Sequence, residues 1–429
     1  MLHNVKLGKN LRSVSIVGIG ATPFMNTILN DTYKGLTHGE LFGYAAMDAM
    51  KDAHVSPKDV QFLIHGCANP GVLEKSITPN LQVAEWVGMR GKGSFSHSEG
   101  CCTGYIGLEQ AVWAVASGAY DIVLSGAADL GCGMPDGNTP AHMRTALTAE
   151  VLFPDLDSIF DRAYTRYLGG GPGMNHDDWI NFYAHENNLT AEQIDEALMH
   201  QAYHFRRAAA LCPRAIKRTT YDELAKEHGF ETPWDYMKSP YNPKMTQYLR
   251  QSSDSCVADG AAAVIVVPTE IAHQFSDKPI EVLGVGASVL DAGIPHLEKK
   301  ATAEAARQVF ELTGLTADDM DLVMVNDFIG SSAFLAAEEI GYLPKGEGWK
   351  YAIDGRLAYD GDKPVNTNGG RTSYGHAFGA SGMADIFEAV TQMRGEAGER
   401  QIKKTPKHTF LRGFGGAQNV RAIILESNF

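Results

Sequence analysis

Long hydrophobic runs and positive charge are both scarce in this sequence. No apolar run approaches the roughly eighteen residues that a membrane span requires, so no membrane-spanning helix is expected. The stretch 1–12 is polar and basic without an apolar core, which predicts no secretory signal and favours a cytoplasmic protein. The 429 residues include 51 Asp or Glu and 37 Lys or Arg, and the net charge of -14 argues against nucleic acid as a main partner.

Cysteine is sparse as well. The chain has six cysteines and no CxxC pair, and the positions are Cys67, Cys101, Cys102, Cys132, Cys212 and Cys256. This pattern predicts reduced thiols of a cytoplasmic protein, without a disulfide framework or a zinc site. We therefore expect no metal in this chain.

Two common nucleotide-binding motifs are also missing. The segment Val14–Ala21 is typical of a strand that ends in a Gly-rich bend, but Pro23 stands where a dinucleotide fingerprint needs its third glycine. The loop 169–173 is rich in glycine, yet it lacks the Gly-Lys-Ser/Thr of a P-loop. Neither kind of nucleotide site is therefore assigned.

What the sequence does contain is ordinary globular composition, 44% hydrophobic and 21% charged, together with a long internal repeat. A strand, a helix and a turn of the first half return in the same order in the second half. The strand lies at 14–21 and returns at 280–287, the helix lies at 45–52 and returns at 305–312, and the turn lies at 55–60 and returns at 315–320. The repeat predicts an α/β protein made of two similar halves packed on each other.

The repeat also relates two helix starts. Residues 103–104 align with 381–382, so Cys101 and His376 each precede an equivalent helix, and pseudo-twofold packing would let these helix starts face each other. The helix after Cys101 is apolar or small nearly all round, which predicts burial. The positive end of its dipole would lower the pKa of Cys101 and make a thiolate available. A small core thiol is the alternative.

His376 lies in the Gly-rich stretch 366–382, which turns tightly and then opens a helix. Glycine lets a ligand approach the main chain closely. An imidazole beside such a turn suits proton transfer or hydrogen bonding to an oxyanion. A buried structural histidine is the alternative interpretation.

Two further turns could serve the same chemistry. Asn326 and Asp327 follow the predicted strand 322–325, at the end of a strand where open α/β sheets place ligands. They could hold a catalytic water or merely cap a turn. The Gly-rich turn 410–417 precedes the strand 420–425, and its backbone N–H groups could bind an oxyanion or simply form a hairpin.

Residues 131 to about 250 do not fit the repeat. They contain a predicted helix from Thr190 to about Ala210, with a capping box at 190–193. A basic cluster follows, made of Arg206, Arg207, Arg214, Lys217 and Arg218. On an acidic protein this cluster is the best candidate for binding a phosphorylated ligand. A solvated helix face is the alternative.

The combination of these motifs resembles the thiolase superfamily over nearly the whole chain. The matching pieces are the duplicated half, Cys-x-Thr-Gly from Cys101, Asp-Gly-Ala-Ala-Ala at 259–263, Asn326 at a strand end, Gly-His-x-x-Gly-Ala-Ser-Gly around His376, and Gly-x-Gly-Gly at 413–416. The stretch around His376 is the most specific of these.

The resemblance implies a five-layer αβαβα fold built from two duplicated halves. Residues 1–130 and 251–275 would form the N-terminal half, and 276–429 the C-terminal half. The insertion 131–250 would be a loop domain that binds coenzyme A, the co-substrate, through the basic cluster.

The resemblance also implies roles for individual residues. Cys101 would be the nucleophile that accepts the acyl group, and its N–H and that of Gly415 would form one oxyanion hole. His376, with a water held by Asn326, would form the other around the CoA-thioester carbonyl.

Some positions depart from the family pattern. Ala377 follows His376 where familiar thiolases have proline, and Gly413 stands where they carry a second catalytic cysteine. Sterol-carrier-protein-type thiolases place that cysteine where Phe328 stands. The usual proton-shuttling thiol has no counterpart, so another group or a water does its work, or the reaction differs.

The pattern is similar to a sterol-carrier-protein-like branch whose members often work with a small zinc-ribbon/OB-fold partner subunit. This implies a homodimer core within a heteromeric complex. The expected reaction is cleavage of a 3-oxoacyl-CoA by free CoA through acyl-Cys101, with an aromatic substrate such as 2-benzoylsuccinyl-CoA. The alternatives are retro-aldol cleavage of a 3-hydroxyacyl-CoA and biosynthetic formation of acetoacetyl-CoA.

Overall fold

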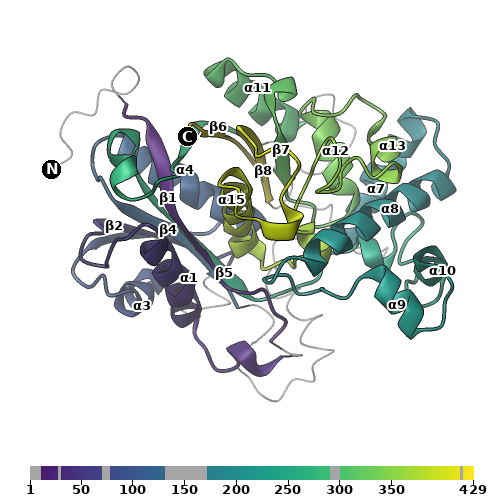
Figure 1. The fold of residues 1–429 in the computed structure, drawn as a ribbon, viewed down its shortest axis with the longest axis horizontal. Coiled ribbons are helices and arrows are strands. Elements are labelled where there is room, and N and C mark those ends of the chain that lie inside the picture. Colours follow the sequence, from purple (N-terminus) through teal and green to yellow (C-terminus); the bar gives the residue numbers. More distant parts are fainter. Residues whose placement is uncertain (1–10, 28–29, 70–77, 131–171, 290–299, 416–418) are drawn as a thin grey trace, which may run out of the picture.

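The fold is seen in a computed structural model that describes residues 11–27, 30–69, 78–130, 172–289, 300–415 and 419–429 (Figure 1). Strands and helices alternate along most of the chain. None of the helices in these ranges is both long and apolar enough to cross a bilayer. No disulfide joins the described cysteines, and Cys132 lies outside these ranges.

The strands of the first half form a mixed sheet. Its order is β3 (Gly93–His97), β2 (Phe62–Gly66), β4 (Val123–Asp129), β5 (Gly260–Pro268) and β1 (Val14–Ala21). The first three are parallel to one another, and β5 runs antiparallel to both of its neighbours. Strand β5 is distant in sequence, yet it lies between β4 and β1.

The second half continues the sheet. Strand β1 pairs over a short register with β6 (Ile280–Val289), and β9 (Asn419–Ser427), β8 (His408–Gly415) and β7 (Leu322–Val325) follow. The whole forms a nine-stranded sheet. Along β7, Leu322 and Met324 face one core and Val323 and Val325 another, as the twofold period of a strand requires.

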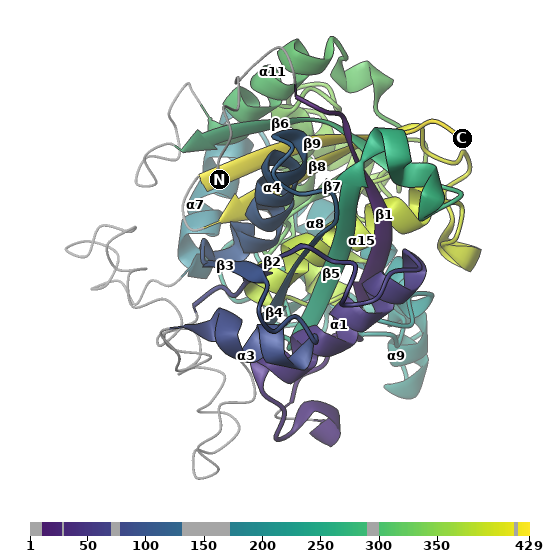
Figure 2. The same ribbon diagram turned by 90° about the vertical axis from the view of Figure 1, so that its left-hand side faces the viewer.

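Helices cover the strands in layers (Figures 1 and 2). Helices α1 (His38–Asp52) and α3 (Pro79–Trp86) pack on the outer face of β1, β2, β4 and β5. Helices α4 (Thr103–Ala116) and α15 (Phe378–Met393) share one core with strands of both halves. Helices α11 (Ala301–Thr313) and α12 (Ser331–Glu339) cover the outer face of β7, β8 and β9. The predicted α/β class with five αβαβα layers is confirmed.

The internal repeat is visible in the close contacts of two glycines. A Cβ on Gly20 would lie 2.1 Å from the carbonyl oxygen of Ala45, and one on Gly286 would lie 2.1 Å from that of Ala305. These are equivalent positions of the two halves, and in each a strand presses against the backbone of its helix. Register shifts also interrupt β1 and β6 at matching places, Ile16/Gly18 and Val282/Gly284.

The repeated turns use the same hydrogen bonds. The carboxylate of Asp59 accepts from the backbone N–H of Ser56 at 2.8 Å and from its hydroxyl at 2.7 Å. Asp319 accepts from the N–H and hydroxyl of Thr316, both at 2.8 Å. In both halves, an aspartate that accepts from the N–H and hydroxyl of a Ser or Thr three residues earlier lies at the end of the helix-to-strand connection.

The segment between β4 and β5 adds helices beside the second half. They are α7 (Pro172–Glu186), α8 (Ala191–Ala210), α9 (Tyr221–Glu227) and α10 (Pro233–Lys238). The predicted capping box of α8 is present, with reciprocal bonds between Thr190 and Gln193. Residues 131–171 of the proposed loop domain lie outside the described ranges.

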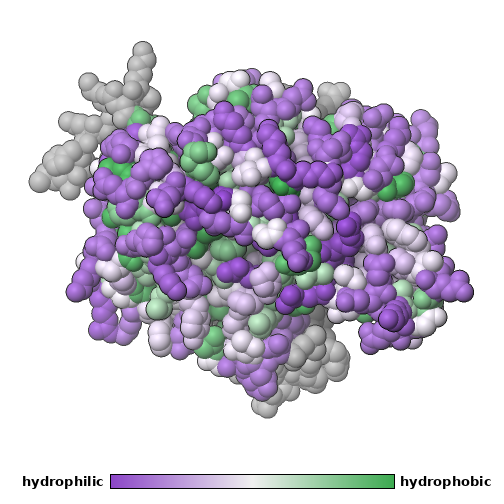
Figure 3. All heavy atoms as spheres, in the orientation of Figure 1, coloured by the Kyte–Doolittle hydropathy of each residue, from purple (hydrophilic) through white to green (hydrophobic). Residues whose placement is uncertain are grey.

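Short helices complete the chain. Helix α13 (Gly348–Ile353) packs on α8, and α14 (Gly370–Ser373) precedes the His376 turn. The 3-10 turns span Asp31–Tyr33, Gly100–Cys102, Gln251–Ser253, Thr269–Gln274, Ala317–Asp319 and Gly398–Arg400. The face drawn in Figure 3 is mainly hydrophilic, with hydrophobic residues scattered over it.

Candidate active site

Cys101 and His376 lie side by side in the fold. Cys101 lies in the 3-10 turn that precedes α4, and His376 lies between α14 and α15. The Sγ atom of Cys101 is 3.3 Å from Nε2 of His376. The two helix starts that the repeat relates therefore bring a thiol and an imidazole within hydrogen-bonding distance.

The approach of α4 and α15 depends on two glycines. A Cβ on Gly104 would lie 2.3 Å from the backbone nitrogen of Met383, closer than real Cβ atoms come to other atoms. A Cβ on Gly382 would lie 2.6 Å from the ring of Tyr105. These repeated glycines let the two helices touch backbone to backbone, and that contact places Cys101 beside His376.

Backbone hydrogen bonds to the segment 256–258 hold His376 in place. Its N–H donates to the carbonyl of Cys256 at 2.7 Å, and its carbonyl accepts from the N–H of Ala258 at 3.0 Å. The ring centroids of Phe328 and Phe378 are 6.2 Å and 5.3 Å from that of the imidazole. Nδ1 has no hydrogen-bond partner among the described residues.

Burial keeps both reacting groups uncharged. It lowers the pKa of His376 well below its ordinary value, and the positive charge of Arg371 lowers it further. Burial raises the pKa of the Cys101 thiol to about 12, although Arg371 opposes this. The expectation that the helix dipole makes a ready thiolate of Cys101 is therefore wrong, because desolvation outweighs the dipole. The resting pair is a thiol and a neutral imidazole.

Gly415 lies against the turn that carries Cys101. A Cβ on Gly415 would be 2.8 Å from the backbone nitrogen of Cys102 and 2.8 Å from the carbonyl oxygen of Glu99. The end of β8 therefore crosses the start of α4 at a distance that only glycine permits. Its predicted part in an oxyanion hole stays a prediction.

In the described part of the chain, no hydrogen bond joins Asn326 to Cys101 or His376. Its Nδ2 donates to the carbonyl of Phe414 at 2.6 Å, and its Oδ1 accepts from the N–H of Phe328 at 3.2 Å. These bonds fix the amide at the end of β7 and leave one Nδ2 hydrogen. The predicted role in holding a water stays a prediction.

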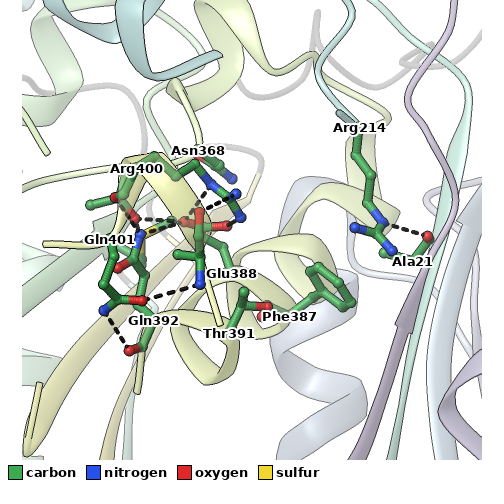
Figure 4. Close-up of polar contacts among 12 residues, drawn as sticks. Ala21, Arg214, Asn368, Phe387, Glu388, Thr391, Gln392, Arg400 and Gln401 are labelled. Atoms are coloured by element: carbon green, nitrogen blue, oxygen red, sulfur yellow. Dashed lines mark hydrogen bonds and ion pairs between the residues drawn. The ribbon is translucent and has the colours of Figure 1, made fainter. Parts of the chain in front are cut away.

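The basic cluster is largely engaged inside the protein. Arg206 donates from Nε to Ser373 Oγ at 3.0 Å, and Arg207 pairs with Asp360 at 2.9 Å. Arg214 donates to the carbonyl of Ala21 at 2.8 Å, with its guanidinium over the ring of Phe387, as Figure 4 shows. These three arginines already have partners, which the sequence could not show.

The remaining two members of the cluster are less committed. Lys217 and Arg218 form no ion pair with any residue in the described ranges, and Arg218 is exposed. The backbone N–H of Lys217 donates to the carbonyl of Ser373 at 3.1 Å, which places this segment beside the His376 turn. They are the members best placed to meet a ligand.

Two buried acids beside the site were not singled out from the sequence. Asp129, at the end of β4, accepts from the N–H of Ala68 at 2.8 Å and from that of Ala380 at 2.9 Å, so it ties the first half to the start of α15. Asp385 in α15 forms a buried ion pair with Arg371. The sequence did contain a signal for both acids, since each is a charged residue within a run of small and apolar residues.

One group of potential metal ligands lies nearby. His38, Cys67 and Asp129 are buried with their ligand atoms within 4.8 Å of one another. The backbone N–H of Leu130 donates to Nε2 of His38 at 2.9 Å, and the Cys67 thiol donates to Asp129 at 3.4 Å. These hydrogen bonds account for the grouping, because they join the start of α1 to the ends of β2 and β4.

A duplicated α/β fold with a buried thiol and imidazole at paired helix starts is suited to covalent acyl transfer. The family model of the thiolase C-terminal domain matches residues 292–427. The acetyl-CoA acetyltransferase of Methanothermobacter thermautotrophicus is 29% identical over 92% of this chain and 94% of its own. The benzoylsuccinyl-CoA thiolase subunit BbsB of Thauera aromatica is 26% identical over 96% of both chains.

Among solved structures, a chain of the Ltp2-ChsH2(DUF35) aldolase matches with a TM-score of 0.75 and 22% identity, over 98% of this chain and 99% of the other. At that identity the match speaks for the fold. The relatives span more than nine tenths of the chain, and the family model spans residues 292–427. The chain is therefore similar to members of the thiolase superfamily over nearly its whole length, and these likenesses support an acyltransferase.

Proposed function

We propose that the protein cleaves a 3-oxoacyl-CoA with free CoA through an acyl-Cys101 intermediate. The observation that carries this is the 3.3 Å contact between Cys101 Sγ and Nε2 of His376. A neutral imidazole with its Nε2 facing the thiol is ready to accept a proton. The relatives named as acetyl-CoA acetyltransferase and benzoylsuccinyl-CoA thiolase support the same chemistry.

The first half-reaction forms the acyl enzyme. His376 accepts the thiol proton as Sγ of Cys101 attacks the 3-keto carbon, and the N–H groups of Cys101 and Gly415 receive the oxyanion. The C2–C3 bond then breaks, and its electron pair passes into the thioester enolate, which hydrogen bonds from His376 and an Asn326-held water stabilise. The proton removed from Cys101 balances the one that C2 gains.

The second half-reaction returns the enzyme to its resting state. The thiol of free CoA gives up its proton and attacks the acyl carbon, and the Cys101 sulfur leaves and is reprotonated. Dividing the transfer into two steps lowers each barrier. A Cβ on Gly413 would lie 2.6 Å from the ring of Tyr105, so no second thiol fits there. We assign its proton-shuttling work to His376 and water.

The surroundings of Cys101 favour an apolar or aromatic acyl group. Cys67, Ala68 and Phe378 form a buried apolar cluster, with Cys101 and Val257 packed against it. Such walls offer dispersion contacts and exclude water. We therefore propose an aromatic 3-oxoacyl-CoA such as 2-benzoylsuccinyl-CoA, with biosynthetic formation of acetoacetyl-CoA as the alternative that the acetyltransferase relative favours.

The test is intact-protein mass after mixing with acetyl-CoA, succinyl-CoA and benzoyl-CoA. The native protein should gain the mass of one acyl group, and the donor that reacts fastest indicates the substrate class. Cys101→Ala should gain none. Cys256→Ala is the matched control, because Cys256 is the other partly exposed cysteine of the described ranges, and it should be acylated normally. An adduct on Cys101→Ala would refute the proposal.

Retro-aldol cleavage of a 3-hydroxyacyl-CoA is the second candidate, and the structural match to an aldolase chain favours it. A lyase consumes no free CoA and needs no cysteine nucleophile. Product release from a 3-hydroxyacyl-CoA in the absence of CoA, retained in Cys101→Ala, would replace the thiolase proposal.

Coenzyme A binding is assigned to Lys217 and Arg218. Replacing each with alanine should raise KM for CoA about fivefold, since an exposed charge contact contributes about 1 kcal/mol. Arg307→Ala is the control, because Arg307 is paired with Glu304 and Glu311 on α11. An unchanged KM in both variants would remove the cluster from the site.

The partners belong to the same proposal. We infer a homodimer that works with a small zinc-ribbon/OB-fold subunit. The relative from Thauera is named as a subunit, and the aldolase is named with a DUF35 partner. Strand β3 lies at the edge of the sheet with Phe95 exposed, which offers a surface for a second copy.

A further inference from the structure

A fully buried ion pair lies beneath the candidate site. The guanidinium of Arg371 donates to both carboxylate oxygens of Asp385, at 2.7 Å and 2.5 Å, and the two side chains are 0% and 1% exposed. The hydroxyl of Tyr105 donates to the same carboxylate at 2.5 Å. Replacing a buried ion pair by apolar side chains of similar volume is often neutral or stabilising, so a buried pair suggests a use other than stability.

The cluster joins the elements that carry the reacting groups. Tyr105 lies in the first turn of α4, four residues after Cys101, and Asp385 lies in α15, which begins after His376. Arg371 lies in α14, just before His376. One ion pair with one hydroxyl therefore braces both sides of the thiol–imidazole contact.

The backbone of Arg371 also leads to His376. The carbonyl of Arg371 accepts from the N–H of Cys256 at 3.2 Å, and the carbonyl of Cys256 accepts from the N–H of His376 at 2.7 Å. The N–H of Arg371 donates to Asp327 at 2.9 Å. The backbone of Arg371 is therefore tied to that of His376 through Cys256.

The charges that face the pair come from several elements. Arg371 from α14 and Asp129 from β4 act on Cys101 with opposite signs, and Arg371 also acts on His376. Around Arg371 itself stand Asp385, Tyr105 and Asp327. Arg371 therefore supplies a positive charge that acts on the thiol, and the strength of that charge depends on how fully the surrounding groups neutralise it.

We propose that Arg371 is a positioning residue whose buried charge favours proton loss from Cys101, and that Asp385 and Tyr105 hold that charge and set its strength. The inference rests on the proposed function for the role of Cys101 as the nucleophile. The resemblance to thiolases does not supply this cluster, which follows from the contacts of this chain.

The test measures alkylation of Cys101 by iodoacetamide, in which the sulfur–carbon bond forms and iodide leaves. The rate is followed by peptide mass spectrometry between pH 7 and 9, where it tracks the small fraction of thiolate. Arg371→Met should slow alkylation roughly tenfold, the effect of about one pKa unit. Asp385→Asn should speed it, because the charge of Arg371 is then less neutralised.

The alkylation rate should change in opposite directions when Arg371 and when Asp385 is replaced. This result separates an electrostatic role of the ion pair from a purely structural one. Loosening of the site would change both rates in the same direction, and that result, or equal rates in all proteins, would overturn the inference. Arg371→Lys keeps the charge without the bidentate fork and should stay closer to the native rate than Arg371→Met. If Arg371→Met does not fold, Tyr105→Phe is compared with Asp385→Asn instead. Losing the hydroxyl of Tyr105 should slow alkylation, whereas Asp385→Asn should speed it.

The measurement is independent of turnover. Alkylation needs neither CoA nor substrate, so rate changes of opposite sign with no acyl adduct would uphold the electrostatic role and reject the thiolase reaction. An acyl adduct on the native protein with unchanged alkylation rates would do the reverse.

Discussion

At the scale of single residues, the site is defined by two uncharged groups in contact. Burial disfavours a charge on Cys101 and on His376 alike, so a preformed ion pair would need two desolvated charges. Proton transfer from sulfur to Nε2 should therefore accompany attack on the substrate. The charged state exists only while the acyl carbon is reacting, which limits side reactions of the thiol.

This arrangement predicts a pH profile. Acyl-Cys101 formation should stay constant as the pH falls from 8 to about 6.5, the ordinary pKa of histidine, because the lowered pKa keeps His376 neutral there. The rate should fall only at lower pH, as the imidazole takes up a proton. Quenched single-turnover mass measurements would give the profile, and a midpoint at or above 6.5 would contradict a neutral buried imidazole.

His376→Asn is the companion variant. Asparagine keeps a hydrogen-bonding side chain but cannot accept the thiol proton, so acylation should slow by roughly 10²- to 10⁴-fold. Its residual rate should increase with pH, as the thiolate fraction of Cys101 does. Acylation at the native rate would mean that another group is the base.

The sequence was sufficient to select Cys101 and His376, because the repeat placed both before equivalent helices. It gave the wrong direction for the pKa of Cys101, since desolvation depends on everything that covers the thiol. It also could not show that Arg206 and Arg214 donate to Ser373 and to a backbone carbonyl in other parts of the chain. Both errors concern contacts between distant residues.

At the scale of elements, the contact between α4 and α15 is the feature that brings the reactive atoms together. Two helices that start from equivalent places cross through Gly104 and Gly382, and only a missing Cβ allows their backbones to approach. The reactive atoms sit at the ends of these helices, so the helix contact controls the distance between them.

A pair of glycine substitutions tests this. Gly104→Ala should destabilise the protein by about 3 kcal/mol, because the new Cβ would lie 2.3 Å from the nitrogen of Met383. It should also slow acylation by separating Cys101 from His376. Gly43→Ala in α1 is the control, since its Cβ would meet only ordinary contacts at 3.9 Å from Trp86.

The control should move in the opposite direction. Gly43→Ala should stabilise the protein by about 0.5–1 kcal/mol, as alanine does in a helix interior. Thermal unfolding of the two variants beside the native protein gives both signs. Equal melting temperatures would show that the helix crossing tolerates a side chain.

Elements with a clear local pattern could be predicted from the sequence, and those without one could not. The strand 322–325, the helix after Thr190 and the turn device at Thr316 follow from local pattern and capping. Strand β3 reads Gly-Ser-Phe-Ser-His and has no apolar run, so only its pairing with β2 identifies it. A short edge strand carries too little local information.

At the scale of the whole molecule, neither half contains a complete site. The thiol belongs to the first half and the imidazole to the second, and β1 links the halves through its short pairing with β6. The apolar core that α4 and α15 share spans both halves. The two halves therefore depend on each other for stability as well as for the site.

The proposed homodimer gives a prediction at this scale. Sedimentation of the native protein at micromolar concentration should show a dimer, and Phe95→Lys in the edge strand should shift it toward monomer, because a charge there opposes edge pairing. Leu312→Lys is the control, since Leu312 on α11 is 66% exposed and Phe95 is 44% exposed. A monomeric native protein would contradict the dimer.

The position of β5 has a consequence for synthesis on the ribosome. Strands β1 and β4 emerge early, but the strand that pairs with both begins only at Gly260. At roughly 5–20 residues per second, the nascent chain waits roughly 7–28 seconds between the end of β4 and the end of β5 with these two edges unpaired. Chaperone capture of nascent chains should therefore be strongest before residue 268 appears, and slower translation there should increase aggregation.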